Sequence, residues 1–376
     1  MQKTLNVRDF TLLIAVVVIG LFFAWRSDFN FVSARNLSNL SVELSITAVL
    51  ALGMLLIIVP GEIDLSVGSG VGLFGGVAAV LVFWHDWPAP LAMALAAATA
   101  VAVWAGMGAL IVTQRIPSFI ITLAGLLVFR GVQWMVIENA TIPVRAGGQD
   151  NLYSLLTTWH LPPRGGYLLV LAVMAALVYA GIVARRRRRA FGFPLESAEL
   201  AFLKLFIIGQ LLLMLVLVCN QHRGVPLSAL ILGAVALAVW VLTQHTRFGR
   251  YLYAIGGNRE AAVISGVPVP RVVIGAFALM GLIVALDGLM QTAYGGYSTT
   301  GVGEYMELDA IAACVIGGTS LKGGRGSVVG VIFGALLMAV LLNGMNLLAY
   351  APETKLIVRG SVLALAVWVD MRFARR

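Results

Sequence analysis

The chain has 376 residues, of which 60% are apolar and only 11% are charged. A soluble core of this size cannot hide so much apolar surface from water, so the composition excludes a soluble globular protein and indicates an integral membrane protein. The net charge of +9 is the excess of Lys and Arg expected on cytoplasmic loops, and we assign it no role in nucleic-acid binding.

Apolar runs of about 20 residues, the length that crosses a bilayer as a helix, recur along the whole chain. We therefore predict an all-α polytopic bundle that forms one transmembrane domain, residues 1–376, surrounded by membrane lipid. Hydropathy and helix-breaking residues predict twelve spans: 10–25, 38–58, 66–84, 90–112, 117–137, 167–184, 201–219, 226–243, 271–292, 304–321, 327–347 and 355–371.

The distribution of basic residues predicts the orientation of this bundle. Most Lys and Arg residues, from Lys3 to Arg375 and Arg376, fall on one side of the membrane if the N-terminus is cytoplasmic. Cytoplasmic loops carry such an excess, so both termini are expected in the cytoplasm. The arginine run at 185–189 is interpreted as an anchor among anionic lipid headgroups.

The stretch PGEIDLSVGS at 60–69 interrupts the apolar pattern between the second and third spans. Pro60 and Gly61 break the helix, and the Asp64 side chain can cap the next one. Irregular backbone at membrane depth is tolerated where it lines a cavity or is buried in protein. Capping alone and capping combined with lining of a transport path both remain open. The candidate path residues here are Gly61, Glu62, Asp64 and Ser66.

Glycines recur every four residues after this break, at Gly68, Gly72 and Gly76. They predict a smooth face for close packing, not a dinucleotide site. The segment ELSITAV at 43–49 resembles ELDAIAA at 307–313, and the glycine spacing returns at 330 and 334. Internal duplication and chance similarity both remain open.

Ionisable residues inside the spans are few, and each is costly in lipid. Asp287 is the remaining candidate for the translocation path, and Arg130 is its expected partner. Most of the others lie close to predicted outer span ends, where we expect structural ion pairs or snorkelling. The full set is Glu43, Arg130, Asp287, Glu307, Asp309 and Arg359.

The longest predicted cytoplasmic loop contains AIGGNREAAVISGVPVPR at 254–271. Its segment NREAAVIS is short and helix-prone, with two glycines before it and Gly266 and Pro268 after it. Such flanks predict a rigid knob of about two turns outside the membrane, with Arg259 and Glu260 on its exposed part.

Several sequence motifs of enzymes are missing. The dipeptide GK does not occur, so the chain has no P-loop, and neither H-E-x-x-H nor G-x-S-x-G is present. We therefore predict no catalytic residues, no cofactor and no metal. Any ATP must be hydrolysed by a separate chain.

Together, GEIDLSVGS and GGNREAAVISGV resemble the permease subunits of bacterial ABC importers for monosaccharides, the ribose, arabinose and xylose group. The resemblance extends from the second span to the last. The section from the arginine run to Gly224 looks additional to the usual ten-span plan, as in the xylose-type permeases, which are the most similar. In that family the loop forms a short helix that docks in a cleft of the ATPase. The residues concerned here are Gly256, Gly257, Asn258, Arg259, Glu260, Ala261, Ala262, Ser265 and Gly266.

This resemblance implies a multi-pass subunit in the bacterial inner membrane that imports a monosaccharide, D-xylose or another pentose. The implied partners are a cytoplasmic ABC ATPase, an extracytoplasmic sugar-binding protein and a second permease copy. A related permease for nucleosides, branched amino acids or an autoinducer is the nearer alternative. A proton-coupled secondary transporter, which would need a titratable relay at the midplane, is the more distant one.

Overall fold

The structure is a computed structural model that describes residues 7–194 and 197–374, and it is almost entirely helical. The first half holds helices α1 (Val7–Arg26), α2 (Ala34–Ile58), α3 (Val67–Phe83), α4 (Ala89–Gln114), α5 (Ser118–Val136), α6 (Leu152–Thr158) and α7 (Pro163–Ala190). The second half holds α8 (Ala198–Asn220), α9 (Leu227–His245), α10 (Arg247–Gly257), α11 (Arg259–Ile264), α12 (Val269–Gly295), α13 (Met306–Ile316), α14 (Val328–Leu347) and α15 (Pro352–Ala374). Two short 3-10 turns, η1 (Asn30–Val32) and η2 (Ala146–Gly148), complete the helical elements. The predicted all-α class is confirmed.

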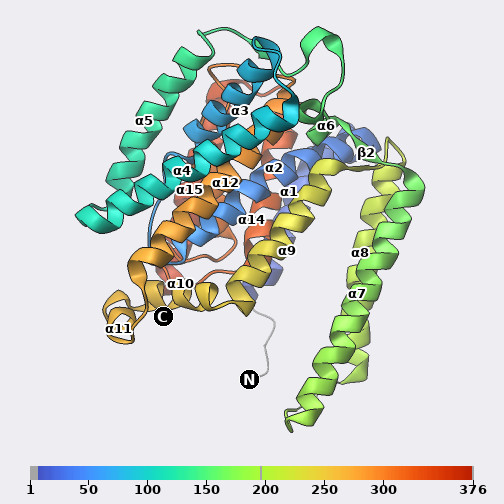
Figure 1. Ribbon diagram of the computed structural model, residues 1–376. Coiled ribbons are helices and arrows are strands. Elements are labelled where there is room, and N and C mark those ends of the chain that lie inside the picture. The colour runs from blue at the N-terminus through green and yellow to red at the C-terminus, as the bar shows by residue number, and fades with distance from the viewer. Residues whose placement is uncertain (1–6, 195–196, 375–376) are drawn as a thin grey trace.

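The centre of the bundle is built from α2, α3, α12, α13 and α14, which pack on one another (Figure 1). Of the most apolar stretch of α2, 83% is buried, whereas none of the corresponding stretch of α7 is. A helix that is apolar on every side and surrounded by other helices belongs to the core, while α7 presents its apolar residues to lipid.

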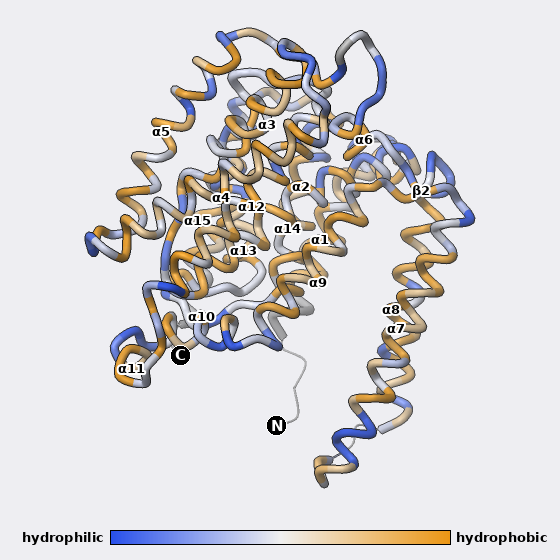
Figure 2. Tube along the Cα trace, viewed as in Figure 1, coloured by the Kyte–Doolittle hydropathy of each residue, from blue (hydrophilic) through white to orange (hydrophobic). Residues whose placement is uncertain are grey.

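Helices α7 and α8 form a hairpin that stands apart from the bundle (Figure 1). The two helices pack on each other, and the end of α8 meets α2. Figure 2 shows apolar residues along both helices and hydrophilic residues near the end of α7, where the arginine run lies. The section that the sequence marks as additional to the ten-span plan, from the arginine run to Gly224, covers the end of α7 and all of α8.

The count of twelve spans is not confirmed. Within the described residues, eight helices are long and apolar enough to cross a membrane, namely α2, α4, α5, α7, α8, α9, α12 and α14. The predicted span 304–321 contains the helix α13, whose 11 residues reach roughly 16 Å, half the thickness of a hydrocarbon core. Hydropathy did not distinguish this half-length helix from a span because hydropathy does not record where the chain stops being helical. Residues 1–6 and 375–376, with Lys3, Arg375 and Arg376, lie outside the described residues.

Two helix–loop–helix units meet in the core, α2–loop–α3 and α13–loop–α14. Their loops touch, since the backbone N–H of Gly324 donates to the carbonyl oxygen of Val59 at 2.8 Å. The predicted close packing is confirmed at Gly68 and Gly72. A Cβ on Gly68 or Gly72 would collide with the irregular segment 302–307, and one on Gly334 would meet the backbone of α13.

Two short strand pairs fasten the loops at the face of the bundle that carries α6. Strand β1 (Ile142–Pro143) pairs antiparallel with β4 (Tyr297–Ser298), which follows α12, and β2 (His160–Leu161) pairs with β3 (Val225–Pro226). Between them, Tyr153 of α6 is fully buried and its hydroxyl donates to the Gly75 carbonyl of α3 at 2.8 Å. The long loop after α5 is therefore anchored in the bundle.

Candidate functional site

The predicted knob is helix α11, at the opposite face from α6 (Figure 1). The Asn258 side chain caps it by accepting a hydrogen bond from the Ala261 N–H at 2.9 Å, and Gly266 follows its end with a φ of +78°. Asparagine and glycine suit these two positions because one supplies a cap oxygen and the other tolerates a left-handed backbone. The sequence prediction of a short helix framed by these residues is confirmed.

The nine residues predicted to dock do not share one environment. Gly257 and Glu260 are exposed, whereas Ala262 is buried against the bundle. A Cβ on Gly256 would collide with the backbone of Val59 and Gly324. Helix α11 also exposes two apolar side chains, Val263 at 57% and Ile264 at 87%.

Arg259 connects the knob to the broken segment between α2 and α3. Its Nη1 lies 2.8 Å from Oε1 of Glu62. The Glu62 side chain is nearly buried, at 8% exposure, while the Arg259 side chain is half exposed. The sequence identified both residues but gave no sign that they pair, because 197 positions separate them.

The broken segment holds its remaining polar groups inside the protein. Asp64 is fully buried, and its Oδ1 accepts from the N–H of Ser66 at 2.8 Å and from the Ser66 hydroxyl at 2.6 Å. Its Oδ2 accepts from the Trp104 indole N–H at 2.7 Å. Helix α5 adds a hydrogen bond from the N–H of Ile63 to Ser118 Oγ at 3.0 Å. Both oxygens of Asp64 thus have protein partners. Its bonds to Ser66 close a turn before α3, whose N-terminus has no side-chain cap hydrogen bond, so the expected capping of this helix by Asp64 is wrong.

A groove of about 620 Å³ lies beside the Arg259–Glu62 pair, between the knob and the turn that joins α4 to α5. Val263 and Val267 line one side of it, and Ile116 and Pro117 line the other. Val263, the neighbour of the exposed Ile264 in α11, lines this groove. This face therefore offers a projecting apolar side chain next to a partly apolar depression.

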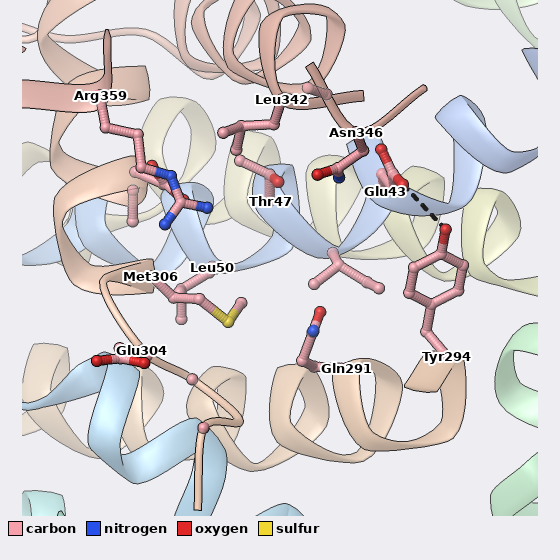
Figure 3. Close-up of a pocket in the computed structure, with 16 residues that line it drawn as sticks. Glu43, Thr47, Leu50, Gln291, Tyr294, Glu304, Met306, Leu342, Asn346 and Arg359 are labelled. Carbon is pink, nitrogen blue, oxygen red and sulfur yellow. Dashed lines mark hydrogen bonds and ion pairs between the residues drawn. The ribbon is translucent and has the colours of Figure 1, made fainter. Parts of the chain in front are cut away.

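A second cavity, of about 200 Å³, lies among α2, α12, α13, α14 and α15 (Figure 3). Glu43 and Tyr294 meet at one end, where the tyrosine hydroxyl donates to Oε1 of Glu43 at 2.9 Å. Gln291, Asn346 and Arg359 point into the space. Apolar side chains complete the wall, among them Ile46, Leu50, Met306 and Leu342.

The sequence pointed to part of this cavity and missed the rest. It singled out Glu43, Asp309 and Arg359 as ionisable residues in apolar spans. It did not single out Gln291 and Asn346. A neutral amide in an apolar run cannot be recognised as part of a cavity until the positions of the neighbouring helices are known. The predicted path residues Gly61, Glu62, Asp64, Ser66 and Asp287 do not line this cavity.

Two ion pairs lie beside the cavity, one with helix α13 and one with the irregular segment that precedes it. Arg359 of α15 lies 3.3 Å from Asp309, and Arg130 of α5 lies 3.7 Å from Glu304. The expected pair of Arg130 with Asp287 is therefore wrong. Asp287 is fully buried in α12, and neither of its carboxylate oxygens has a hydrogen-bond partner among the described residues.

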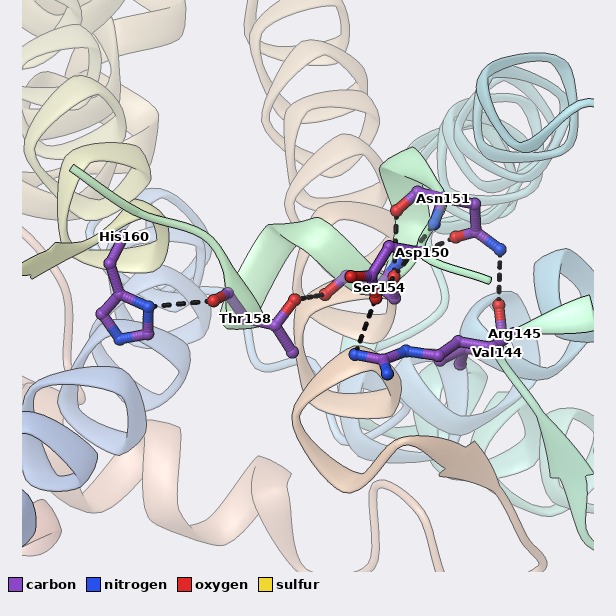
Figure 4. Close-up of polar contacts among 7 residues, drawn as sticks. All are labelled: Val144, Arg145, Asp150, Asn151, Ser154, Thr158 and His160. Carbon is purple, nitrogen blue, oxygen red and sulfur yellow. Dashed lines mark hydrogen bonds and ion pairs between the residues drawn. The ribbon is translucent and has the colours of Figure 1, made fainter. Parts of the chain in front are cut away.

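The face that carries α6 is polar and internally bonded (Figure 4). Arg145 pairs with Asp150 at 2.9 Å, and Asn151 caps α6 by accepting from the Ser154 N–H at 3.0 Å. His160 Nδ1 lies 2.9 Å from the Thr158 carbonyl oxygen, and partial burial lowers the pKa of this imidazole. These contacts hold the polar side chains of the loop in fixed positions on this face. In the part of the chain that the structure covers, no three His, Cys, Asp or Glu side chains cluster as metal ligands would.

Comparison with known proteins assigns relatives over the whole chain. The sequence model of one family, described as the permease component of branched-chain amino acid transport systems, matches residues 36–367. The xylose transport system permease protein XylH of Escherichia coli (strain K12) is 40% identical over 379 residues, which cover 100% of this chain and 94% of the relative.

Two further relatives are similar over most of their length. XylH of Haemophilus influenzae (strain ATCC 51907 / DSM 11121 / KW20 / Rd) is 38% identical over 98% of this chain and 97% of its own length. The ribose import permease protein RbsC of Escherichia coli (strain K12) is 36% identical over 91% of this chain and 87% of its own length. No solved structure matches the chain significantly.

Proposed function

Because the chain belongs to the family of branched-chain amino acid transport system permease components, and its relatives include xylose and ribose permeases, we propose that it is the membrane-spanning subunit of an ATP-driven monosaccharide importer. The substrate is D-xylose or another pentose. The subunit resides in the bacterial inner membrane as one transmembrane domain and performs no covalent chemistry.

The observation that carries this proposal is the exposed knob α11 and its link to the bundle core. A helix outside the membrane that presents Ile264 to water at 87% exposure is suited to contact another protein. The Arg259–Glu62 pair joins this helix to the broken segment. The knob, with the nine loop residues from Gly256 to Gly266, is the docking site for a cytoplasmic ABC ATPase, and movement of the ATPase reaches the core through this pair.

The remaining partners follow from the same assignment. The bonded surface around α6 receives an extracytoplasmic sugar-binding protein, and a second copy of the permease completes a homodimer. Both chain ends then lie in the cytoplasm, on the side of the knob. The polar segment 60–66 and Asp287 contribute to the movement between outward and inward access. Such a movement requires that ATP or sugar bind the two states with different affinity.

Reconstitution tests the proposal directly. The permease is placed in proteoliposomes with its ATPase and the sugar-binding protein, and uptake of radiolabelled xylose is measured with and without ATP. We expect uptake that requires ATP and all three components and that persists with a protonophore. Uptake by the permease alone under a proton gradient would instead assign a proton-coupled transporter, for which the unpartnered Asp287 is the available carboxylate.

Competition distinguishes the substrate classes. Unlabelled xylose, ribose, a nucleoside and leucine are added in separate reactions, with each delivered by its own binding protein where one is required. The proposal expects pentoses to be transported and leucine to be ignored. Transport of leucine or of a nucleoside in place of xylose would assign the chain to another substrate class of the same family.

A further inference from the structure

The cavity of Figure 3 lies in the half of the bundle nearer α6. Tyr294 and Asn346 belong to the last turns of α12 and α14, and Glu43 lies in the first half of α2. The chain leaves α12 into β4, which pairs with β1 beside the α6 surface. The cavity is therefore on the side where a binding protein would release sugar.

Several polar groups in this cavity have no protein partner. Among the described residues, neither the Gln291 amide nor the Asn346 amide makes a side-chain hydrogen bond, although both lie in transmembrane helices and face the space. A polar group at membrane depth is costly unless water or a ligand satisfies it. Each amide offers both donors and an acceptor, which matches a hydroxyl group that must do both.

The basic groups beside the cavity are already paired. Arg359 pairs with Asp309, and Arg130 of α5 pairs with Glu304. The partner of Glu43 is the neutral hydroxyl group of Tyr294. Among the described residues, no unpaired cation is left beside the cavity to hold the carboxylate of an amino acid, which favours a ligand that carries hydroxyl groups in place of a carboxylate.

The volume agrees with a small ligand. The space measures about 200 Å³, which is less than the roughly 300–1,000 Å³ of pockets that enclose drug-sized ligands. This is room for a monosaccharide, whereas a nucleoside adds a base to its sugar. Leu50 and Met306 supply apolar wall, and the exposed ring of Tyr294 offers a face on which C–H groups of a sugar can pack.

We infer that this cavity is a sugar-binding subsite of the permease, in which Gln291 and Asn346 hydrogen-bond the hydroxyl groups of a monosaccharide while the Glu43–Tyr294 pair forms one end. The inference rests on the proposed function and extends it to named residues. The subsite holds the sugar while the bundle changes between its two states. Without it, released sugar returns to the binding-protein side and ATP is hydrolysed without net uptake.

The test replaces the two amides by apolar side chains of similar shape, Gln291→Met and Asn346→Leu, singly and together. The measured quantity is xylose taken up per ATP hydrolysed by the reconstituted complex. One lost hydrogen bond is expected to lower this ratio about 2- to 10-fold, and the double variant is expected to lower it further. Gln210→Met in α8 is the matched control, because Gln210 is an exposed amide on the outer hairpin; its ratio stays at the wild-type value.

A further variant distinguishes a lost sugar contact from a misfolded protein. Thr47 lines the same cavity, and Thr47→Val removes its hydroxyl without changing its shape, so it is expected to lower the ratio while leaving the melting temperature in detergent unchanged. The inference is overturned if uptake per ATP in the Gln291→Met, Asn346→Leu and Thr47→Val variants equals that of Gln210→Met. A wild-type complex that takes up no sugar contradicts the proposed function instead, so the two failures are distinguishable.

Discussion

At the scale of single residues, neighbouring positions in one motif have different roles. Gly256 and Gly257 look equivalent in the sequence, but of the two only Gly256 has another backbone where a Cβ would be placed. Asp64 and Glu62 also differ in their roles. Asp64 accepts hydrogen bonds inside the core, whereas Glu62 pairs with Arg259 of the knob. The sequence could predict that these residue types matter. It could not separate their roles, because the deciding contacts come from residues that lie 40 or more positions away.

The first prediction compares the same substitution at two adjacent glycines. Gly256→Ala places a methyl group on the Val59 carbonyl oxygen and the Gly324 N–H, and such overpacking typically costs about 1–3 kcal/mol. Gly257→Ala meets nothing within 4 Å. We expect Gly256→Ala to lower the melting temperature of the purified permease and Gly257→Ala to leave it unchanged or slightly raised. Equal melting temperatures for the two variants would show that the loops do not touch as described.

At the scale of elements, prediction succeeded where local signals suffice. Helix α11 is marked by its cap at Asn258 and by Gly266, both within a few residues of it. Helix α13 was predicted as a full span because hydropathy does not record where an apolar run leaves helical geometry. Its length is set by the loops that fold back against α3 and α14. Gly266 has a left-handed φ, so any side chain placed there would strain the backbone. A substitution at Gly266 would therefore not test the surface contacts of α11 alone.

The second prediction tests the link between α11 and the broken segment by exchanging charges. Glu62→Arg or Arg259→Glu alone places like charges together and is expected to reduce xylose uptake strongly. The double variant restores an ion pair and is expected to recover most of the uptake. The Arg259 side chain is half exposed, so the pair itself contributes about 1 kcal/mol or less to stability, and the melting temperature changes little in Arg259→Glu.

The control for this exchange is Arg271→Glu, a charge reversal at an exposed residue near the start of α12 that makes no ion pair within residues 7–194 and 197–374. It should transport like the wild type. Recovery in the double variant is the decisive result. If the double variant is no better than the worse single variant, Arg259 and Glu62 do not act as a pair.

At the scale of the whole molecule, α5 connects the two regions described above. Its first turn bonds the broken segment, through Ser118 to the Ile63 N–H. Its other end holds the segment beside the cavity, because the Gln133 amide donates to the Thr299 carbonyl oxygen at 2.9 Å and Arg130 pairs with Glu304. The helix lies at the edge of the bundle (Figure 1) and packs mainly along α3. A stiff helix bonded at both ends can carry a displacement from the knob side to the cavity wall.

The last prediction asks whether α5 acts in this way. Gln133→Leu removes the bond to Thr299 and Ser118→Ala removes the bond to Ile63, and each loss of a buried hydrogen bond costs about 1 kcal/mol of stability. Both variants are expected to bind the ATPase normally and to take up less xylose per ATP. If α5 is the one connection between the two regions, loss of either hydrogen bond already interrupts it. The double variant is then expected to take up as much xylose per ATP as the single variant with the lower uptake. Thr113→Ala in α4 is the control, since that hydroxyl bonds only the carbonyl of Ala109 in its own helix. Losses that multiply in the double variant would mean that the two ends of α5 act independently, and that the knob reaches the cavity through α2 and α3 instead.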